Sequence, residues 1–95
     1  MTTVATRVRK ISEIEDFDIV VIRDGVPVDV RSNGVMRDYP YINRSVGDIT
    51  VAQWRDRRFH PNYHGLTCQV LYEDGTVAPG QTLLRTVRES YETAD

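Results

Sequence analysis

The fold is decided by the stretch Phe17-Asp18-Ile19-Val20-Val21-Ile22-Arg23-Asp24-Gly25-Val26-Pro27-Val28-Asp29-Val30. An Asp-Gly pair between two apolar runs is typical of a two-residue hairpin turn, because both central residues of that turn need positive φ. The turn pairs Arg23 with Val26. This register gathers six apolar residues on one face of the hairpin: Phe17, Ile19, Val21, Val26, Val28 and Val30. Pro27 cannot donate to a ladder, so the second strand is expected at a sheet edge.

A second hairpin is predicted over residues 66–78, where Asp74-Gly75 supplies the turn. The apolar side chains of its first strand share one parity: Leu66, Cys68, Val70 and Tyr72. Its return strand is short, over residues 76–78. The composition favours a sheet core, because the chain has 13 Val and six Ile against four Leu. β-Branched side chains suit a pleated, half-buried surface.

A helix is predicted over residues 50–59. Thr50 and Gln53 fit a capping box, and Ile49 and Trp54 fit a hydrophobic staple around the same helix start. Pro61 ends the helix. The staple predicts that Trp54 faces the sheet and is structural.

The C-terminal segment admits two structures. Leu83, Leu84, Val87 and Tyr91 lie on one stripe of a helix, which is the preferred interpretation. A strand over residues 82–91 is the alternative, because three of these residues also share parity.

Two further segments carry weaker signals. Near the N-terminus, residues 8, 11 and 14 are apolar at a helical spacing of three, which is a short pattern. Residues 31–48 are predicted to form a long loop.

The predicted fold class is α+β. A small antiparallel sheet of about four strands, built from two Asp-Gly hairpins, is covered by one or two helices. Residues 1–7 are expected to form a flexible tail, residues 8–91 a single domain and residues 92–95 a frayed end.

Charge and cysteine content narrow the class of protein. The net charge is −2, which argues against general affinity for nucleic acid, although residues 31–64 alone carry +3. Cys68 is the only cysteine, so no disulfide forms within the chain, as in proteins of a reducing compartment. No apolar run is long enough to span a membrane. The sequence therefore predicts a cytoplasmic protein without membrane contact.

A candidate binding surface follows from the aromatic and basic residues of the middle of the chain: Tyr39, Tyr41, Arg44, Arg55, Arg57, Arg58, His60, Tyr63 and His64. On the predicted helix, Arg55 and Arg58 interrupt the apolar arc, and Arg57 points outward. The arginines either grip phosphates beside stacking rings, or reach the acidic segments at residues 13–18, Asp24 and Asp29. The second interpretation is preferred because the whole chain is negatively charged.

Metal binding and catalysis are not predicted. Asp56, His60, His64 and Cys68 recur every four residues, but Pro61 and Gly65 would break the helix that aligns them. Cys68 shares the parity of the apolar positions, so its thiol is expected to be buried and inert. No catalytic residue, metal ligand or cofactor is assigned.

The leading function is that of a non-catalytic protein-binding module. Val20 and Ile22 fall on the face opposite the main apolar set, so self-association through the hairpin at residues 19–30 is expected, as a homodimer, beside an unidentified protein partner. The alternative is a nucleic-acid-binding accessory protein that uses Arg44 and the basic helix around Trp54–Arg58. A small enzyme of unknown reaction is the third interpretation.

Overall fold

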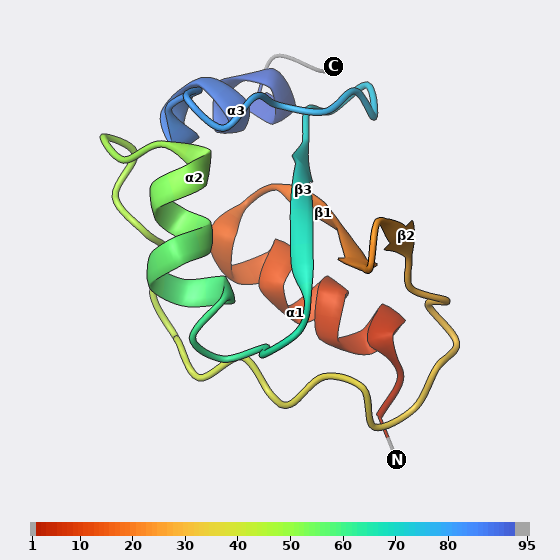
Figure 1. Ribbon diagram of the computed structural model, residues 1–95. Coiled ribbons are helices and arrows are strands. Elements are labelled where there is room, and N and C mark those ends of the chain that lie inside the picture. Colours follow the sequence, from red (N-terminus) through yellow and green to blue (C-terminus); the bar gives the residue numbers. More distant parts are fainter. Residues whose placement is uncertain (1, 93–95) are drawn as a thin grey trace.

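The computed structural model describes residues 2–92, and its elements alternate between helices and short strands (Figure 1). In chain order they are α1 (Val4–Glu15), β1 (Asp18–Arg23), β2 (Val26–Pro27), α2 (Val51–Trp54), the π-helix η1 (Arg55–Phe59), β3 (Thr67–Leu71) and α3 (Leu84–Glu92). The α+β class is therefore confirmed.

The sheet is antiparallel, with three strands in the order β2-β1-β3. Ile19 lies opposite Val70, and Val21 lies opposite Cys68. These four side chains are buried, whereas their neighbours along both strands are exposed or half-buried. The alternation that the sequence predicted for residues 17–21 and 66–70 is thus confirmed, and it gives the sheet one core face.

The sheet has three strands where about four were predicted, although the first predicted hairpin is present, with positive φ at both Asp24 and Gly25. Arg23 pairs with Val26 across the turn, and the Val28 N–H still donates to the Val21 carbonyl, so Pro27 turns its missing N–H to the open edge of the sheet. The chain then leaves the sheet, and the Val30 carbonyl accepts from the first turn of α1. Val26 and Val30 are consequently 63% and 53% exposed instead of lying on the core face.

The second return strand is diverted in the same way. Residues 76–78 make only an isolated bridge, Leu71 to Val77. The carbonyls of Gly80 and Thr82 then accept from the first two N–H groups of α2, those of Ala52 and Val51. The first N–H groups of a helix have no acceptor within that helix. In both extended segments, backbone carbonyls accept from these N–H groups instead of from a neighbouring strand.

The helices agree better with the sequence. Thr50 and Gln53 form the predicted capping box, and the segment ends at Phe59, although its second half is π-helical. Residues 84–92 form a helix, as preferred over a strand. α1 begins at Val4, within the range assigned to a tail, because the Thr3 side chain accepts from the Thr6 N–H. Residues 93–95 of the predicted frayed end lie outside the described residues.

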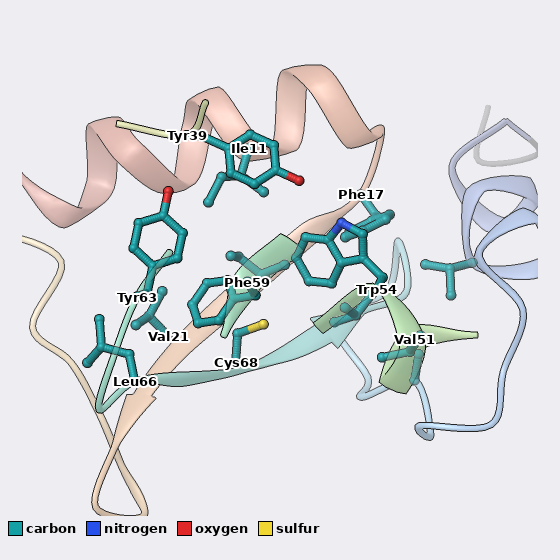
Figure 2. Packing of buried hydrophobic residues seen from close by; sticks show 14 of the residues in the cluster. Ile11, Phe17, Val21, Tyr39, Val51, Trp54, Phe59, Tyr63, Leu66 and Cys68 are labelled. Carbon is teal, nitrogen blue, oxygen red and sulfur yellow. The ribbon is translucent and has the colours of Figure 1, made fainter. Parts of the chain in front are cut away.

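The core is an aromatic row between α1 and the sheet (Figure 2). The rings of Phe17 and Trp54 meet edge to face, with their centroids 5.1 Å apart. The centroids of the Trp54 and Phe59 rings are 6.1 Å apart, and those of Phe59 and Tyr63 are 4.8 Å apart. Trp54 is fully buried, as the staple predicted, and Cys68 lies beneath the row. Within residues 2–92, no helix combines the length and the apolar character needed to cross a membrane.

Candidate interaction site

A buried carboxylate organises the surface near the end of α1. Glu15 is fully buried and accepts hydrogen bonds from four residues, which together with it we call the Glu15 cluster. Its Oε2 accepts from the Tyr39 hydroxyl at 2.6 Å and from Arg58 at 2.8 Å. Its Oε1 accepts from the Ser45 N–H at 2.9 Å and from Arg88 at 3.1 Å. A buried charge is tolerated when it is paired and hydrogen-bonded in this way.

Arg88 fastens α3 to the cluster. It is 5% exposed, and its guanidinium also donates to the carbonyls of Glu15 and Ser45, both at 2.7 Å. Burial lowers the pKa of Arg88 below its ordinary value, and the Glu15 carboxylate opposes that shift. One side chain of α3 thereby joins the end of α1 to the loop at Ser45.

Tyr39 and Arg58 complete the cluster. Burial raises the pKa of Tyr39, and its hydrogen bond to Glu15 raises it further, so the phenol stays protonated and donates. Burial lowers the pKa of Arg58, but Tyr39 and Glu15 outweigh this and hold it above its ordinary value. Arg58 also donates to the Asn43 carbonyl at 2.6 Å and stacks 4.2 Å from the centre of the Tyr41 ring.

The loop at residues 39–47 is therefore fixed at several points along its length, namely at Tyr39, Tyr41, Asn43 and Ser45. A fifth contact fixes its end, since the Gly47 carbonyl accepts from the first turn of α3. Between these points two large apolar side chains face water.

Those two side chains are Ile42, which is 88% exposed, and Val46, which is 66% exposed. Val46 also borders a hollow of about 260 Å³, which is lined by Arg44, Ser45, Val46, Ile49, Arg57 and Arg58. We call Ile42, Val46 and this hollow the loop surface. It combines exposed apolar groups with three arginines and no acidic residue in the hollow.

The structure divides the nine predicted site residues into three groups. Arg44, Arg57 and Arg58 meet in the hollow, and Tyr41 lies under Arg58. Arg57 is exposed, as predicted, while Arg55 and Arg58 are half-buried. Arg58 reaches the acidic segment at residues 13–18, which was the preferred interpretation.

The second group serves the interior. Tyr39 is 1% exposed and Tyr63 is 3% exposed, so neither side chain belongs to a binding surface. Arg55 does not reach an acidic segment, and its guanidinium donates to the Cys68 carbonyl at 3.0 Å. These three residues help to hold the fold together.

The third group is His60 and His64. His64 is exposed and lines a separate hollow with Arg23 and Leu66. The Nδ1 atom of His60 lies 3.1 Å from Oδ1 of Asp56. Its Nε2 atom lies 3.1 Å from the Thr67 hydroxyl oxygen. The order Asp–His–hydroxyl resembles a catalytic triad, but Asp56 and Thr67 are exposed to water, so the arrangement is interpreted as a surface link from η1 to β3.

Metal and thiol chemistry gain no support from the geometry. Within residues 2–92, no three His, Cys, Asp or Glu side chains are placed to hold a metal ion. Cys68 is buried as predicted, and burial raises the pKa of its thiol to about 12. The thiol is therefore protonated at neutral pH.

A further hollow, of about 490 Å³, lies between the ends of α1 and α3 and was not predicted. The polar groups that line it are used internally. Ser12 donates to Asp18, Asp16 pairs with Arg44, and the Tyr91 hydroxyl donates to the Leu71 carbonyl. This hollow therefore offers few unpaired groups to a ligand.

Sequence reasoning missed the members of the Glu15 cluster that lie on α1 and α3. A signal was present, because Glu15 is four residues after Ile11 on the apolar stripe of α1, and Arg88 is four residues after Leu84 on that of α3. Opposite charges at two apolar-stripe positions indicate a buried ion pair. For Ile42 and Val46 the sequence holds no comparable signal, since exposure of single apolar residues is ordinary.

Comparison of the chain with protein-family models, with curated proteins and with solved structures found no match.

Proposed function

We propose that this chain is a non-catalytic protein-binding module and that the loop surface is where it binds. The observation that carries the proposal is the exposure of Ile42 and Val46 on a loop held by the buried Glu15 cluster. Apolar groups on an already ordered loop lose little conformational entropy on binding, and such preorganisation favours affinity. A buried ionic cluster that fixes an exposed apolar loop is thus well suited to recognition.

The exposed ion pairs around the loop support the same function. Arg44 pairs with Asp16 at 2.8 Å, and both side chains are more than half exposed. Such pairs are worth about 0–1 kcal/mol, so a partner's carboxylate can replace them at little cost. Arg57 is exposed and forms no ion pair with another residue of the range 2–92.

The proposal is tested by affinity capture from native lysate with matched variants. The wild-type chain and Val77→Ser, in which the altered residue is 48% exposed and lies in another loop, should retain the same protein. Ile42→Ser and Val46→Ser should fail to retain it while their thermal unfolding stays unchanged. Equal capture by all four chains would contradict the proposal.

Self-association through the hairpin at residues 19–30 is proposed as part of this function. Val20 and Ile22 are only half-buried, and Val26 and Val30 at the same hairpin are exposed, so the hairpin presents apolar side chains that the chain itself does not cover. Sedimentation equilibrium should give a dimer mass for the wild type and a lower mass for Val26→Ser. A monomer mass for the wild type would exclude it.

Nucleic-acid binding is the second candidate, favoured by the three arginines that share the hollow. For such binding, removing one arginine that contacts a phosphate should reduce the slope of log affinity against log salt by nearly one unit. A nuclease arm of the capture experiment, with Arg57→Ala, separates this function from the first. A cytoplasmic location is also proposed, supported by the single buried Cys68.

A further inference from the structure

The chemistry of the loop surface is specific enough to describe its partner. The hollow is lined by Arg44, Arg57 and Arg58 together with Val46 and Ile49, and Ile42 lies close to Arg44 in sequence on the same loop. Its charged lining is entirely cationic and its apolar lining is aliphatic. A complementary group therefore brings a carboxylate and an apolar side chain at the same time.

The arginines are not equally free to bind. Arg58 is held by Glu15 and by the Asn43 carbonyl, so it contributes a fixed positive charge to the hollow. Arg57 is exposed, and Arg44 holds only the exposed Asp16. A planar guanidinium presents a fork of donors that matches a carboxylate, so Arg57 and Arg44 are the groups that meet the ligand.

Charges beyond the hollow decide between a carboxylate-bearing segment and a polyanion. Asp56 precedes Arg57 and its side chain is 74% exposed, while the exposed Asp48 beyond the loop is already paired with Arg85 at 2.8 Å. The whole chain carries −2. A nucleic-acid backbone would be repelled by the Asp56 carboxylate and by the net negative charge of the chain, whereas a short segment with one or two acidic residues reaches the arginines alone.

We infer that the loop surface binds a protein segment in which acidic residues stand beside a large aliphatic or aromatic residue. The apolar side chain enters the hollow against Val46 and Ile49, and the carboxylate pairs with Arg57 and Arg44. Ile42 adds apolar contact outside the hollow. The inference rests on the proposed function and names the kind of partner.

The test is selection of peptides from a displayed random library on the wild-type chain. The enriched peptides should carry Asp or Glu next to Leu, Ile, Phe or Trp. Arg57→Ala should weaken their binding about tenfold, the effect of removing one charge-assisted hydrogen bond. Raised salt should weaken it as well. Arg31→Ala is the matched control, because Arg31 is also exposed and lies beside the opposite end of α1.

The outcomes separate this inference from the proposed function. Enriched peptides without acidic residues, whose binding is abolished in Ile42→Ser, would overturn the inference and leave a protein-binding module. If binding of no enriched peptide depended on Ile42 or Val46, the inference and the proposed function would both be wrong. Tight binding of a single-stranded oligonucleotide with a steep salt slope, reduced by Arg57→Ala, would overturn both in favour of nucleic acid.

Discussion

Glu15→Gln is the sharpest perturbation of this fold, because it keeps the shape of the side chain and removes its charge. Oε1 accepts from the Ser45 N–H and Arg88, and Oε2 accepts from Arg58 and from the hydroxyls of Tyr39 and Ser45. An amide NH₂ in place of Oε1 faces two groups that only donate, the Ser45 N–H and Arg88, and one in place of Oε2 faces Arg58.

The expected loss of stability follows from the burial of the partners. Arg88 is 5% exposed, so without Glu15 it becomes a buried cation without a counter-charge. Removing one member of a buried ion pair costs about 3–5 kcal/mol. A small domain is stable by about 5–15 kcal/mol, so the variant should lose a large part of its free energy of unfolding.

Urea unfolding followed by Trp54 fluorescence and by circular dichroism measures this change. Glu13→Gln is the matched control, because Glu13 lies on the same helix with its side chain exposed, and it should change stability by less than about 0.5 kcal/mol. In a double-mutant cycle, Arg88→Met should cost less when Glu15→Gln is already present. A loss below about 1 kcal/mol for Glu15→Gln would refute the reasoning.

Four further outcomes are expected. Trp54→Ala should cost about 3–5 kcal/mol in urea unfolding, since it empties a fully buried aromatic site; a loss below about 1 kcal/mol would mean that the indole is not a core element. Burial raises the pKa of Tyr63 from 10.0 to about 12, so its protonated form stabilises the fold below pH 10 and this contribution is lost as the pH rises towards 12. Tyr63→Phe, which removes a buried hydroxyl without a hydrogen-bond partner, should flatten that alkaline loss and leave neutral stability equal or higher. Cys68 should resist iodoacetamide in the native chain and react in urea, as mass spectrometry would show; rapid native labelling would place the thiol at the surface. Gly47→Ala should cost about 1–3 kcal/mol in thermal unfolding, because its Cβ would lie 2.9 Å from the Arg85 Cβ and push the loop from α3; no change would mean that the loop moves freely there.

Sequence patterns predicted the elements whose cause is local. The start of α2 is determined by the capping box of Thr50 and Gln53, which are three residues apart. The core face of the sheet is determined by the alternation of apolar and polar residues within β1 and β3. The stripe of Leu84 and Val87 likewise predicted the last helix. In each case the residues that decide the structure lie within a few positions of one another.

The features that sequence reasoning missed depend on distant partners. After Asp24-Gly25, the residues that follow β2 are as strand-prone as those before it, yet their carbonyls are taken by the start of α1. The same competition removes the return strand after Asp74-Gly75. Helix N–H groups and sheet ladders compete for the same carbonyls, and only the tertiary arrangement decides between them.

The candidate site was predicted in part for the same reason. Exposure of Arg57 and the reach of Arg58 towards residues 13–18 followed from the helical wheel. Burial of Tyr39 did not, because it depends on Glu15, which is 24 positions away. The predicted surface was therefore too wide, and the loop at residues 41–46 emerged only from the packing.

The Glu15 cluster also has a consequence for the order of events during synthesis. Arg88 follows Glu15 by 73 positions, so the pair can form only after the ribosome has added that many residues, about 4–15 s at about 5–20 residues per second. Throughout that interval Arg58 is the only cation of the cluster that Glu15 can pair with, and the carbonyls of Glu15 and Ser45 lack the donors that Arg88 supplies. Burial of this cluster is thus complete only when α3 is present, and the contact between α1 and the loop gains its last hydrogen bonds after translation of Arg88.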